Sequence, residues 1–254
     1  MDMNLMNKTV VLTGASSGLG EALAYELNRH GANLILVARR EDRLQQVAKT
    51  LQAEYVVYDL EHSPERLADQ IAERYGMIDV LINNAGFGEF SFLEETTVET
   101  IESMNRVNVL APIRLTKACL PLFRPQGMIV NVASQAGKLP TPKSTIYCMT
   151  KAALYQFSNA LRLELKPKGL HVMTVNPGPI ATEFFIRADL SRKYEKNVAS
   201  IVLSKEKLAR TVTRAIIREK REVNAPFWME GSAKAYGLFP RIIEWLGKSG
   251  FDKK

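Results

Sequence analysis

The stretch TGASSGLG at residues 13–20 decides the fold of this chain. It follows a short apolar run at 9–13 (TVVLT), and it opens a segment in which leucines recur every four residues. An apolar run, a glycine-rich turn and a helical pattern in this order predict a strand, a phosphate-binding loop and a helix. We therefore expect this stretch to form the first strand–helix unit of a parallel sheet.

The glycines of this stretch are suited to holding a dinucleotide. Gly14 would permit a tight turn, while Gly18 and Gly20 would let the backbone approach a pyrophosphate and let the helix pack closely on the sheet. The first turn of the helix would offer unpaired N–H groups and a favourable dipole to the phosphates. The alternative is an ordinary strand–helix turn, but the complete order of strand, loop and helix favours cofactor binding.

Further apolar runs alternate with helix-length segments along the chain. The runs are nearly continuous in apolar character, as is typical of parallel strands that are covered on both faces. The expected strands are 9–13, 33–38, 55–58, 80–83, 128–132 and 171–176, and the expected helices are 18–30, 41–52, 65–75, 97–122 and 144–166. This alternation predicts an α/β fold with a doubly wound, Rossmann-like parallel sheet. We expect one domain over residues 1–225, followed by a C-terminal helical extension at 226–254 that packs on the same domain or on a partner subunit.

Length and composition fit a single globular protein without a metal or a membrane span. The chain has 254 residues, of which 46% are apolar, enough for a sizeable core. Its two cysteines, Cys119 and Cys148, form no CxxC pair, and its three histidines lack further ligands at metal-binding spacing. No apolar run approaches the ~18 residues that a bilayer requires. We therefore expect a cytoplasmic protein with reduced thiols and no metal site.

The positive charge is concentrated near the C-terminus. The net charge is +7, and residues 205–254 hold twelve Lys/Arg and six Asp/Glu. Such a patch could meet an anionic membrane surface, nucleic acid or only solvent. Because no nucleic-acid recognition motif accompanies the charge, we expect no nucleic-acid partner.

The residues after the second expected strand indicate which nicotinamide cofactor is used. NAD enzymes usually carry an acid here, which accepts a hydrogen bond from the ribose 2′-hydroxyl. This chain has Arg39 and Arg40 instead. Arg39 suits a 2′-phosphate, which its guanidinium can hold with two charge-assisted hydrogen bonds, and Ser16 and Ser17 could add hydroxyl donors. We expect NADP(H) as the cofactor; the alternative is that both arginines only flank a solvated helix start.

Several motifs in a fixed order resemble the short-chain dehydrogenase/reductase family. They are TGASSGLG at 13–20, NNAG at 83–86, Ser134, Tyr147-x-x-x-Lys151 and Pro177-Gly178, and the resemblance spans about residues 8–225. Within the family the chain looks most like the basic, NADP-using reductases. The resemblance implies an NADP-dependent oxidoreductase that moves a hydride between the nicotinamide and a carbonyl or alcohol substrate.

Tyr147 and Lys151 form a pair that could move a proton. A tyrosine with its ordinary pKa near 10 is a poor base at neutral pH. Lys151 lies four residues later on the same helix face, and its ammonium would favour the tyrosinate. Ser134 follows a buried run and would lie at the carboxyl end of a strand, where doubly wound folds bind ligands. Its hydroxyl could hold the substrate oxygen against Tyr147.

The resemblance assigns further roles to residues at matching positions. It implies that Asn108 belongs to the catalytic centre, because the matching residue bends a long helix and binds a water that links Lys151 to solvent. It also implies that Asp59 contacts adenine and that Lys151 contacts the nicotinamide ribose. The expected cofactor-binding residues are Gly14, Ser16, Ser17, Gly18, Leu19, Gly20, Arg39, Arg40, Asp59, Leu60, Asn84, Ala85, Gly86, Tyr147, Lys151, Pro177, Gly178 and Thr182.

The sequence indicates the chemical class of the substrate but does not identify the compound. The expected pocket rims are 89–93, 136–143 and 183–204, and their apolar side chains are Phe90, Phe92, Leu139, Phe184, Phe185 and Ile186. These rims favour an apolar ketone, aldehyde or 3-oxo compound. Two other functions stay open: a regulatory protein that binds the cofactor without turnover, and an interaction protein that uses the basic C-terminal surface. The presence of both Tyr147 and Lys151 argues against the regulatory protein.

Two parts of the chain are expected to make further contacts. The resemblance implies a homodimer or homotetramer formed through the helices 97–122 and 144–166. In the extension, Pro240 suits a first helical turn. One helical face would carry Leu238, Phe239, Ile242, Ile243 and Leu246. We expect the extension to close over or beside the active site; packing on a partner subunit and contact with an anionic membrane are the alternatives.

Overall fold

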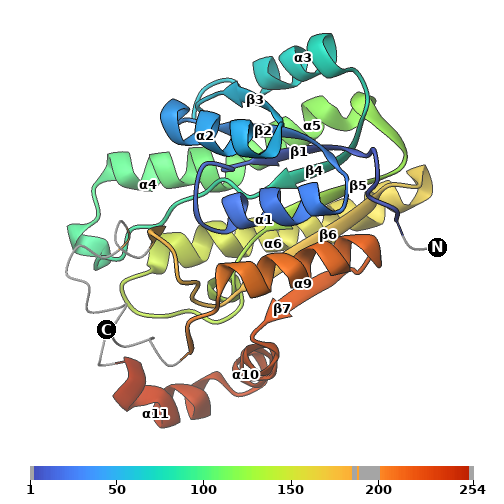
Figure 1. Cartoon of the computed structure of the whole chain (residues 1–254). Coiled ribbons are helices and arrows are strands. Elements are labelled where there is room, and N and C mark those ends of the chain that lie inside the picture. Colours follow the sequence, from blue (N-terminus) through green and yellow to red (C-terminus); the bar gives the residue numbers. More distant parts are fainter. Residues whose placement is uncertain (1–2, 185–187, 189–200, 252–254) are drawn as a thin grey trace.

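Seven parallel strands form one sheet in the computed structural model, which describes residues 3–184, 188 and 201–251 (Figure 1). The strands are β1 (Thr9–Thr13), β2 (Asn33–Ala38), β3 (Glu54–Val57), β4 (Ile78–Asn83), β5 (Phe123–Val132), β6 (His171–Pro177) and β7 (Glu222–Ala225). Their order is β3-β2-β1-β4-β5-β6-β7, and each neighbouring pair is parallel. From β1 the strands are added first on one side, to β3, and then on the other side, from β4 to β7. A crevice is expected where this order changes, at the carboxyl ends of β1 and β4. The predicted doubly wound, Rossmann-like fold is confirmed.

Helices cover both faces of the sheet. One face carries α1 (Gly18–Arg29), α2 (Glu41–Leu51) and α9 (Lys205–Ile217), and the other carries α3 (Pro64–Tyr75), α5 (Ala111–Cys119) and α6 (Thr145–Leu165). On β1, Val10 and Leu12 belong to the first core, whereas Val11 between them belongs to the second. Successive side chains of a strand point to opposite faces, so a strand buried on both sides must be apolar throughout. This explains the continuous apolar runs.

The helix predicted over 97–122 is helical nearly throughout, but it is not regular. The segment divides into α4 (Val98–Asn105), a π-helical turn (Arg106–Leu110), α5 and a 3-10 turn (Leu120–Leu122), and β5 begins at Phe123. The π-helical turn contains Asn108, whose side chain bonds to the backbone of Phe87. A tertiary hydrogen bond of this kind interrupts the regular helix, as π-turns at functional sites commonly do. Further 3-10 turns are Leu93–Glu95, Gln135–Gly137 and Lys166–Lys168.

The C-terminal part contains a strand that the sequence did not predict. β7 has the sequence EVNA, which lacks an apolar run, and it pairs with β6 at the edge of the sheet. Beyond it lie α10 (Phe227–Leu238) and α11 (Pro240–Phe251), at one end of the molecule (Figure 1). Leu238 ends α10 and Pro240 begins α11, so the predicted apolar face is divided between two helices. No helix within the described residues is both long enough and apolar enough to cross a bilayer.

Candidate active site

A cavity of about 690 Å³ opens at the carboxyl ends of the strands. Its walls come from the segments that follow β1, β2, β3, β4, β5 and β6, which are far apart in the sequence. Every residue predicted to bind the cofactor lines this cavity, and so does Ser134. Asn108 is not part of the lining. The sheet therefore brings the predicted residues together at one place.

The glycines between β1 and α1 stand where side chains would not fit. Gly14 has a φ of +69°, and a Cβ atom there would lie 2.9 Å from the Cα of Ala85. A Cβ on Gly20 would lie 2.2 Å from the carbonyl oxygen of Gly14. Ser17 precedes α1, but its side chain makes no capping hydrogen bond. The first N–H groups of α1 can therefore bind another acceptor. Because Gly18, the first residue of α1, lines the cavity, such an acceptor would lie inside it.

The NNAG element after β4 braces this loop. The side-chain amide of Asn84 donates to the carbonyl oxygens of Thr13 at 2.9 Å and Gly14 at 3.3 Å. The Thr13 hydroxyl oxygen accepts from the backbone N–H groups of Asn84 and Ala85, both at 3.0 Å. These bonds hold the end of β4 against the end of β1 and fix the shape of the glycine loop.

The two arginines after β2 take different positions. The guanidinium of Arg40 donates to the hydroxyls of Ser16 and Ser17 and lies 3.4 Å from the carboxylate of Glu183. Arg39 is 67% exposed, and its guanidinium lies 3.5 Å from the carboxylate of Asp59. Arg40 and the serines thus form a group of donors beside the glycine loop, with Arg39 at its outer edge.

Ser134, Tyr147 and Lys151 line the same cavity as the glycine loop. Their exposed fractions are 8%, 9% and 4%. The Ser134 hydroxyl accepts from the N–H of Ala136 at 3.1 Å and donates to the carbonyl oxygen of Pro177 at 3.3 Å. The Lys151 ammonium donates to the carbonyl oxygen of Val132 at 2.9 Å and lies 5.8 Å from the centre of the Tyr147 ring. A hydroxyl, a phenol and an ammonium therefore line one wall, where they can hold an oxygen atom and move a proton.

Burial strongly affects Lys151. It lowers the pKa of this side chain from 10.5 to about 8, because desolvation penalises the charged form. A lysine with a pKa near neutrality can exchange its proton at physiological pH. Perturbed groups of this kind are typical of active sites.

Asn108 lies behind the cavity wall and supports it. Its side-chain oxygen accepts from the N–H of Phe87 at 3.0 Å, and its amide donates to the carbonyl oxygen of Phe87 and the hydroxyl of Thr150. A Cβ on Gly86 would lie 2.9 Å from the Asn108 oxygen and 3.3 Å from the Lys151 nitrogen. The π-helical turn thus connects the NNAG element to α6 one residue before Lys151.

The substrate side of the cavity is apolar. The Tyr147 ring packs edge-on against Phe90, with ring centres 5.8 Å apart, and lies 5.5 Å from Phe184. Leu139 also lines the cavity. Phe92 does not; it is 47% exposed and lies under the ammonium of Lys143. The predicted rim residues Phe185 and Ile186 lie outside the described residues.

Two of the lining residues without a predicted role bear on the site. Met229, on the first turn of α10, lines the cavity, and its sulfur packs near Gly178. Glu183 was assigned only to a rim, yet its carboxylate lies 2.6 Å from Arg43 and 3.4 Å from Arg40. No sequence signal could have found Met229, whereas an acid next to the predicted Thr182 could have been matched to the arginines after β2.

Comparisons with known proteins agree with this geometry. A family model described as short chain dehydrogenase matches residues 8–193. The 11-beta-hydroxysteroid dehydrogenase A of Sesamum indicum is 35% identical over 266 aligned positions, which cover 96% of this chain and 75% of that protein. A short chain dehydrogenase/reductase from Burkholderia phymatum, solved in complex with NAD, has a TM-score of 0.86 at 23% identity and covers 94% of this chain and 96% of that chain. A short-chain dehydrogenase from Sphingobium yanoikuyae, solved in complex with NADPH, has a TM-score of 0.78 at 30% identity and covers 92% of this chain and 96% of that chain. The chain belongs to the short-chain dehydrogenase/reductase family of oxidoreductases.

Proposed function

We propose that this chain is an NADP(H)-dependent oxidoreductase that interconverts an apolar carbonyl compound and its alcohol. The observation that carries the proposal is the arrangement of one cavity. A glycine loop at the start of a helix without a side-chain cap lines this cavity, and so do Ser134, Tyr147 and Lys151. A phosphate site and a proton-transfer site within one cavity suit hydride transfer to a carbonyl carbon.

The cavity fits a dinucleotide cofactor. The loop has no room for side chains at Gly14 and Gly20, which is what close backbone approach to a pyrophosphate requires. Arg39 and Arg40 favour a 2′-phosphate, and the NADPH complex of the Sphingobium relative supports the same choice. When bound, the nicotinamide supplies or accepts the hydride.

Three side chains of the chain itself carry the proton chemistry. Ser134 holds the carbonyl oxygen of the substrate, and Tyr147 gives its phenolic proton to that oxygen during reduction. Lys151 favours the resulting tyrosinate by its positive charge. Asn108 is a positioning residue, because it fixes the wall formed by Gly86 and the start of α6.

The lining supports an apolar substrate. Phe90 and Phe184 pack against Tyr147, and Leu139 and Met229 line the same cavity. The Sesamum relative is named for a hydroxysteroid, an apolar alcohol. We place the substrate among apolar ketones, aldehydes and 3-oxo compounds, or the matching alcohols.

The remaining expectations concern assembly and surroundings. We propose that residues 1–225 form the catalytic domain and that 226–254 pack on the same domain, because Met229 reaches the cavity. Leu110 and Met149 are exposed apolar residues on neighbouring parts of the predicted dimer surface, which supports a homo-oligomer. The buried, unpaired thiols of Cys119 and Cys148 suit a reducing compartment such as the cytoplasm.

Tyr147→Phe tests the proposed chemistry. Single-turnover reduction of an accepted apolar ketone by NADPH should slow about 10²–10⁴-fold, because the proton donor is lost. Binding of NADPH should stay nearly unchanged. Tyr155→Phe, the same substitution two turns later on α6, is the control and should turn over like the wild type. Cofactor binding without turnover in the wild type would instead support a regulatory protein, and a wild-type rate in Tyr147→Phe would remove this residue from the mechanism.

A further inference from the structure

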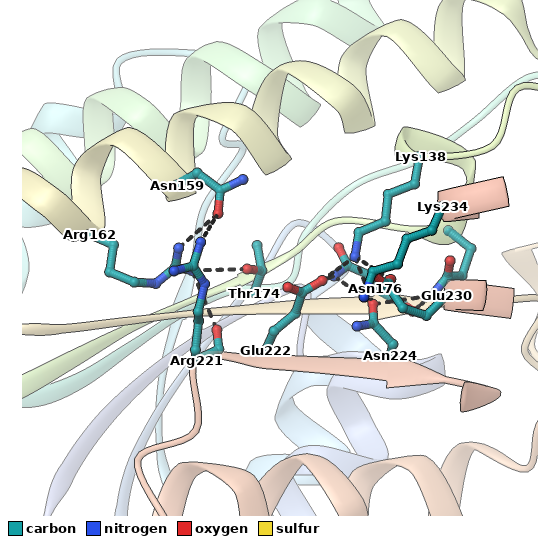
Figure 2. Close-up of polar contacts among 11 residues, drawn as sticks. Lys138, Asn159, Arg162, Thr174, Asn176, Arg221, Glu222, Asn224, Glu230 and Lys234 are labelled. Atoms are coloured by element: carbon teal, nitrogen blue, oxygen red, sulfur yellow. Dashed lines mark hydrogen bonds and ion pairs between the residues drawn. The ribbon is translucent and has the colours of Figure 1, made fainter. Parts of the chain in front are cut away.

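A largely buried lysine lies between two carboxylates beside the active site. The Lys138 side chain is 8% exposed. Its ammonium donates to the carboxylates of Glu222 and Glu230, the latter at 2.7 Å, and to the side-chain oxygen of Asn224 at 3.0 Å (Figure 2). It also lies 4.6 Å from the centre of the Tyr155 ring. The ammonium of Lys138 therefore has three hydrogen-bond acceptors within the protein, one for each of its N–H groups.

The carboxylates keep Lys138 charged. Burial alone lowers the pKa of Lys138, but the hydrogen bonds to Glu222 and Glu230 outweigh it, so that this pKa is raised. Burial likewise tends to raise the pKa of Glu230, yet the bond to Lys138 lowers it. A charge pair that is removed from water tolerates little displacement, because either partner left alone is strongly unfavourable.

The contacts of Lys138 join three separate segments. Lys138 follows the turn Gln135–Gly137, which begins directly after Ser134. Glu222 lies on β7, and Glu230 lies on α10. The amide of Gln135 strengthens the same junction, since it donates to the Asn176 carbonyl at 3.0 Å and to the Asn224 side chain at 3.2 Å. The turn that follows Ser134 is thus fastened to the edge of the sheet and to the C-terminal extension.

Among the described residues, the first turn of α10 has little other anchorage. Ala233 is the only residue of α10 that is buried. Phe227 and Trp228 are 84% and 47% exposed, so their rings do not hold the helix in place. Met229 nevertheless lines the cavity, directly before Glu230. In the described part of the chain, the ion pair with Lys138 is the polar side-chain contact that ties this turn, and with it Met229, to the sheet domain.

We propose that Lys138 is a positioning residue that fixes Ser134 and Met229 together. Through Glu230 it sets the apolar wall that α10 adds to the substrate pocket, and through Glu222 and the Gln135 turn it sets the place of the Ser134 hydroxyl. This inference rests on the proposed function where it concerns turnover, but the anchoring of α10 can be measured without any substrate.

The anchoring has a direct optical readout. The chain has two tryptophans, Trp228 and Trp245, and both lie in the extension. In a Trp245→Phe background, acrylamide quenching of fluorescence reports Trp228 alone. Glu230→Gln should increase the quenching constant up to about twofold, because Trp228 is 47% exposed and would become fully exposed.

The matched control is a second lysine on the same carboxylate. Lys234 lies 3.5 Å from Glu230 and is 73% exposed. Lys234→Met should leave the quenching of Trp228 at the wild-type value, since an exposed ion pair contributes little. Equal quenching in Glu230→Gln and the wild type would overturn the anchoring claim, and so would an equal increase in Lys234→Met.

Kinetics separate the two parts of the proposal. With NADPH and methyl ketones of increasing chain length, Glu230→Gln should raise KM about tenfold for the long ketones and leave kcat and the short ketones unchanged. Lys138→Met should lower kcat about 10- to 100-fold for every ketone, because Ser134 is also displaced. A KM that does not change with chain length in Glu230→Gln would overturn the pocket-wall claim.

Two further variants test the proposal if Lys138→Met does not fold. Glu230→Gln keeps the pair of Lys138 with Glu222, and Lys138→Arg keeps the charge. Lys138→Arg should keep at least about half of the wild-type kcat, whereas a kcat as low as that of an unfolded or Tyr147→Phe protein would contradict a positioning role. Absence of turnover with every ketone in the wild type would refute the proposed function, while the quenching result would still decide the anchoring of α10.

Discussion

Lys151→Met should make the protein more stable in the absence of cofactor while removing its activity. Methionine has nearly the length and volume of the lysine stem, so the substitution chiefly removes a charge. Lys151 is 4% exposed, and burial lowers its pKa to about 8. Keeping the ammonium inside the folded protein therefore costs free energy at neutral pH.

The size of the effect follows from that pKa. At about 1.4 kcal/mol per pKa unit, a fall from 10.5 to about 8 corresponds to about 3 kcal/mol. The substitution also leaves the carbonyl oxygen of Val132 without its donor at 2.9 Å, which costs about 1–2 kcal/mol. We expect the free energy of unfolding at pH 7 to rise by about 1–2 kcal/mol.

The difference between the two proteins should change with pH in one direction. Below about pH 8 Lys151 is protonated in both the folded and the unfolded chain, so its full cost is present and constant. Between about pH 8 and pH 10.5 the unfolded chain binds this proton more readily than the folded one. The stability of the wild type relative to the variant should therefore rise across this range.

Urea unfolding of both proteins between pH 7 and pH 10, without cofactor, measures this difference. Lys49→Met, at an exposed site on α2, is the control and should change the free energy of unfolding by less than about 0.5 kcal/mol. A Lys151→Met protein that is less stable than the wild type at pH 7 would refute the reasoning. So would a difference between the two that stays constant up to pH 10.

Arg39→Asp and Arg40→Asp should each weaken NADPH binding at least about tenfold more than NADH binding, because a charge-assisted contact to the 2′-phosphate is worth roughly 1.5–3 kcal/mol. Fluorescence titration with both cofactors checks this, and equal weakening would mean that the arginines do not read that phosphate. Met149→Glu, at an exposed apolar site on α6, should dissociate the proposed oligomer in sedimentation velocity runs; a wild type that is already monomeric at micromolar concentration contradicts the assembly. The Cys119 thiol, whose pKa burial raises to about 12, should react with iodoacetamide at pH 8 only after unfolding. Mass spectrometry locates the adduct, and alkylation of the native protein at Cys119 would contradict its burial.

The sequence predicted those parts of the fold that depend on local pattern. Six strands were predicted from apolar runs, and all of them except the edge strand β3 are buried on both faces of the parallel sheet. β7 was missed because Glu222 and Asn224 point polar groups into a network near the site instead of adding to an apolar run. The apolar pattern does not reveal the π-turn within the helix at 97–122, because that turn involves hydrogen bonds between Asn108 and Phe87, which lie 21 positions apart; only the family resemblance indicated a bend at Asn108.

In the candidate site, too, local motifs could be predicted from the sequence, whereas contacts between distant residues could not. Motif spacing was enough to select the lining residues, because parallel strands end at one edge of the sheet. Spacing could not tell that Arg40, rather than Arg39, would reach the serines of the glycine loop, since side-chain direction depends on the turn after β2. It also could not bring Met229 to the cavity, because α10 reaches that place through Glu230 and a lysine 92 positions earlier in the chain.

Two lysines near the site illustrate how burial can serve either function or structure. Lys138 meets two carboxylates, and these raise its pKa, so its charge is fixed and holds segments together. Lys151 donates to a neutral carbonyl, and within the described residues no carboxylate forms an ion pair with it. Its pKa falls to about 8, so its charge is stabilised only when another group supplies negative charge. A tyrosinate at Tyr147, with its ring centre 5.8 Å from the Lys151 nitrogen, is such a group. The unfavourable burial of Lys151 thus supports the proposed proton transfer at Tyr147, and the favourable burial of Lys138 supports its proposed positioning role.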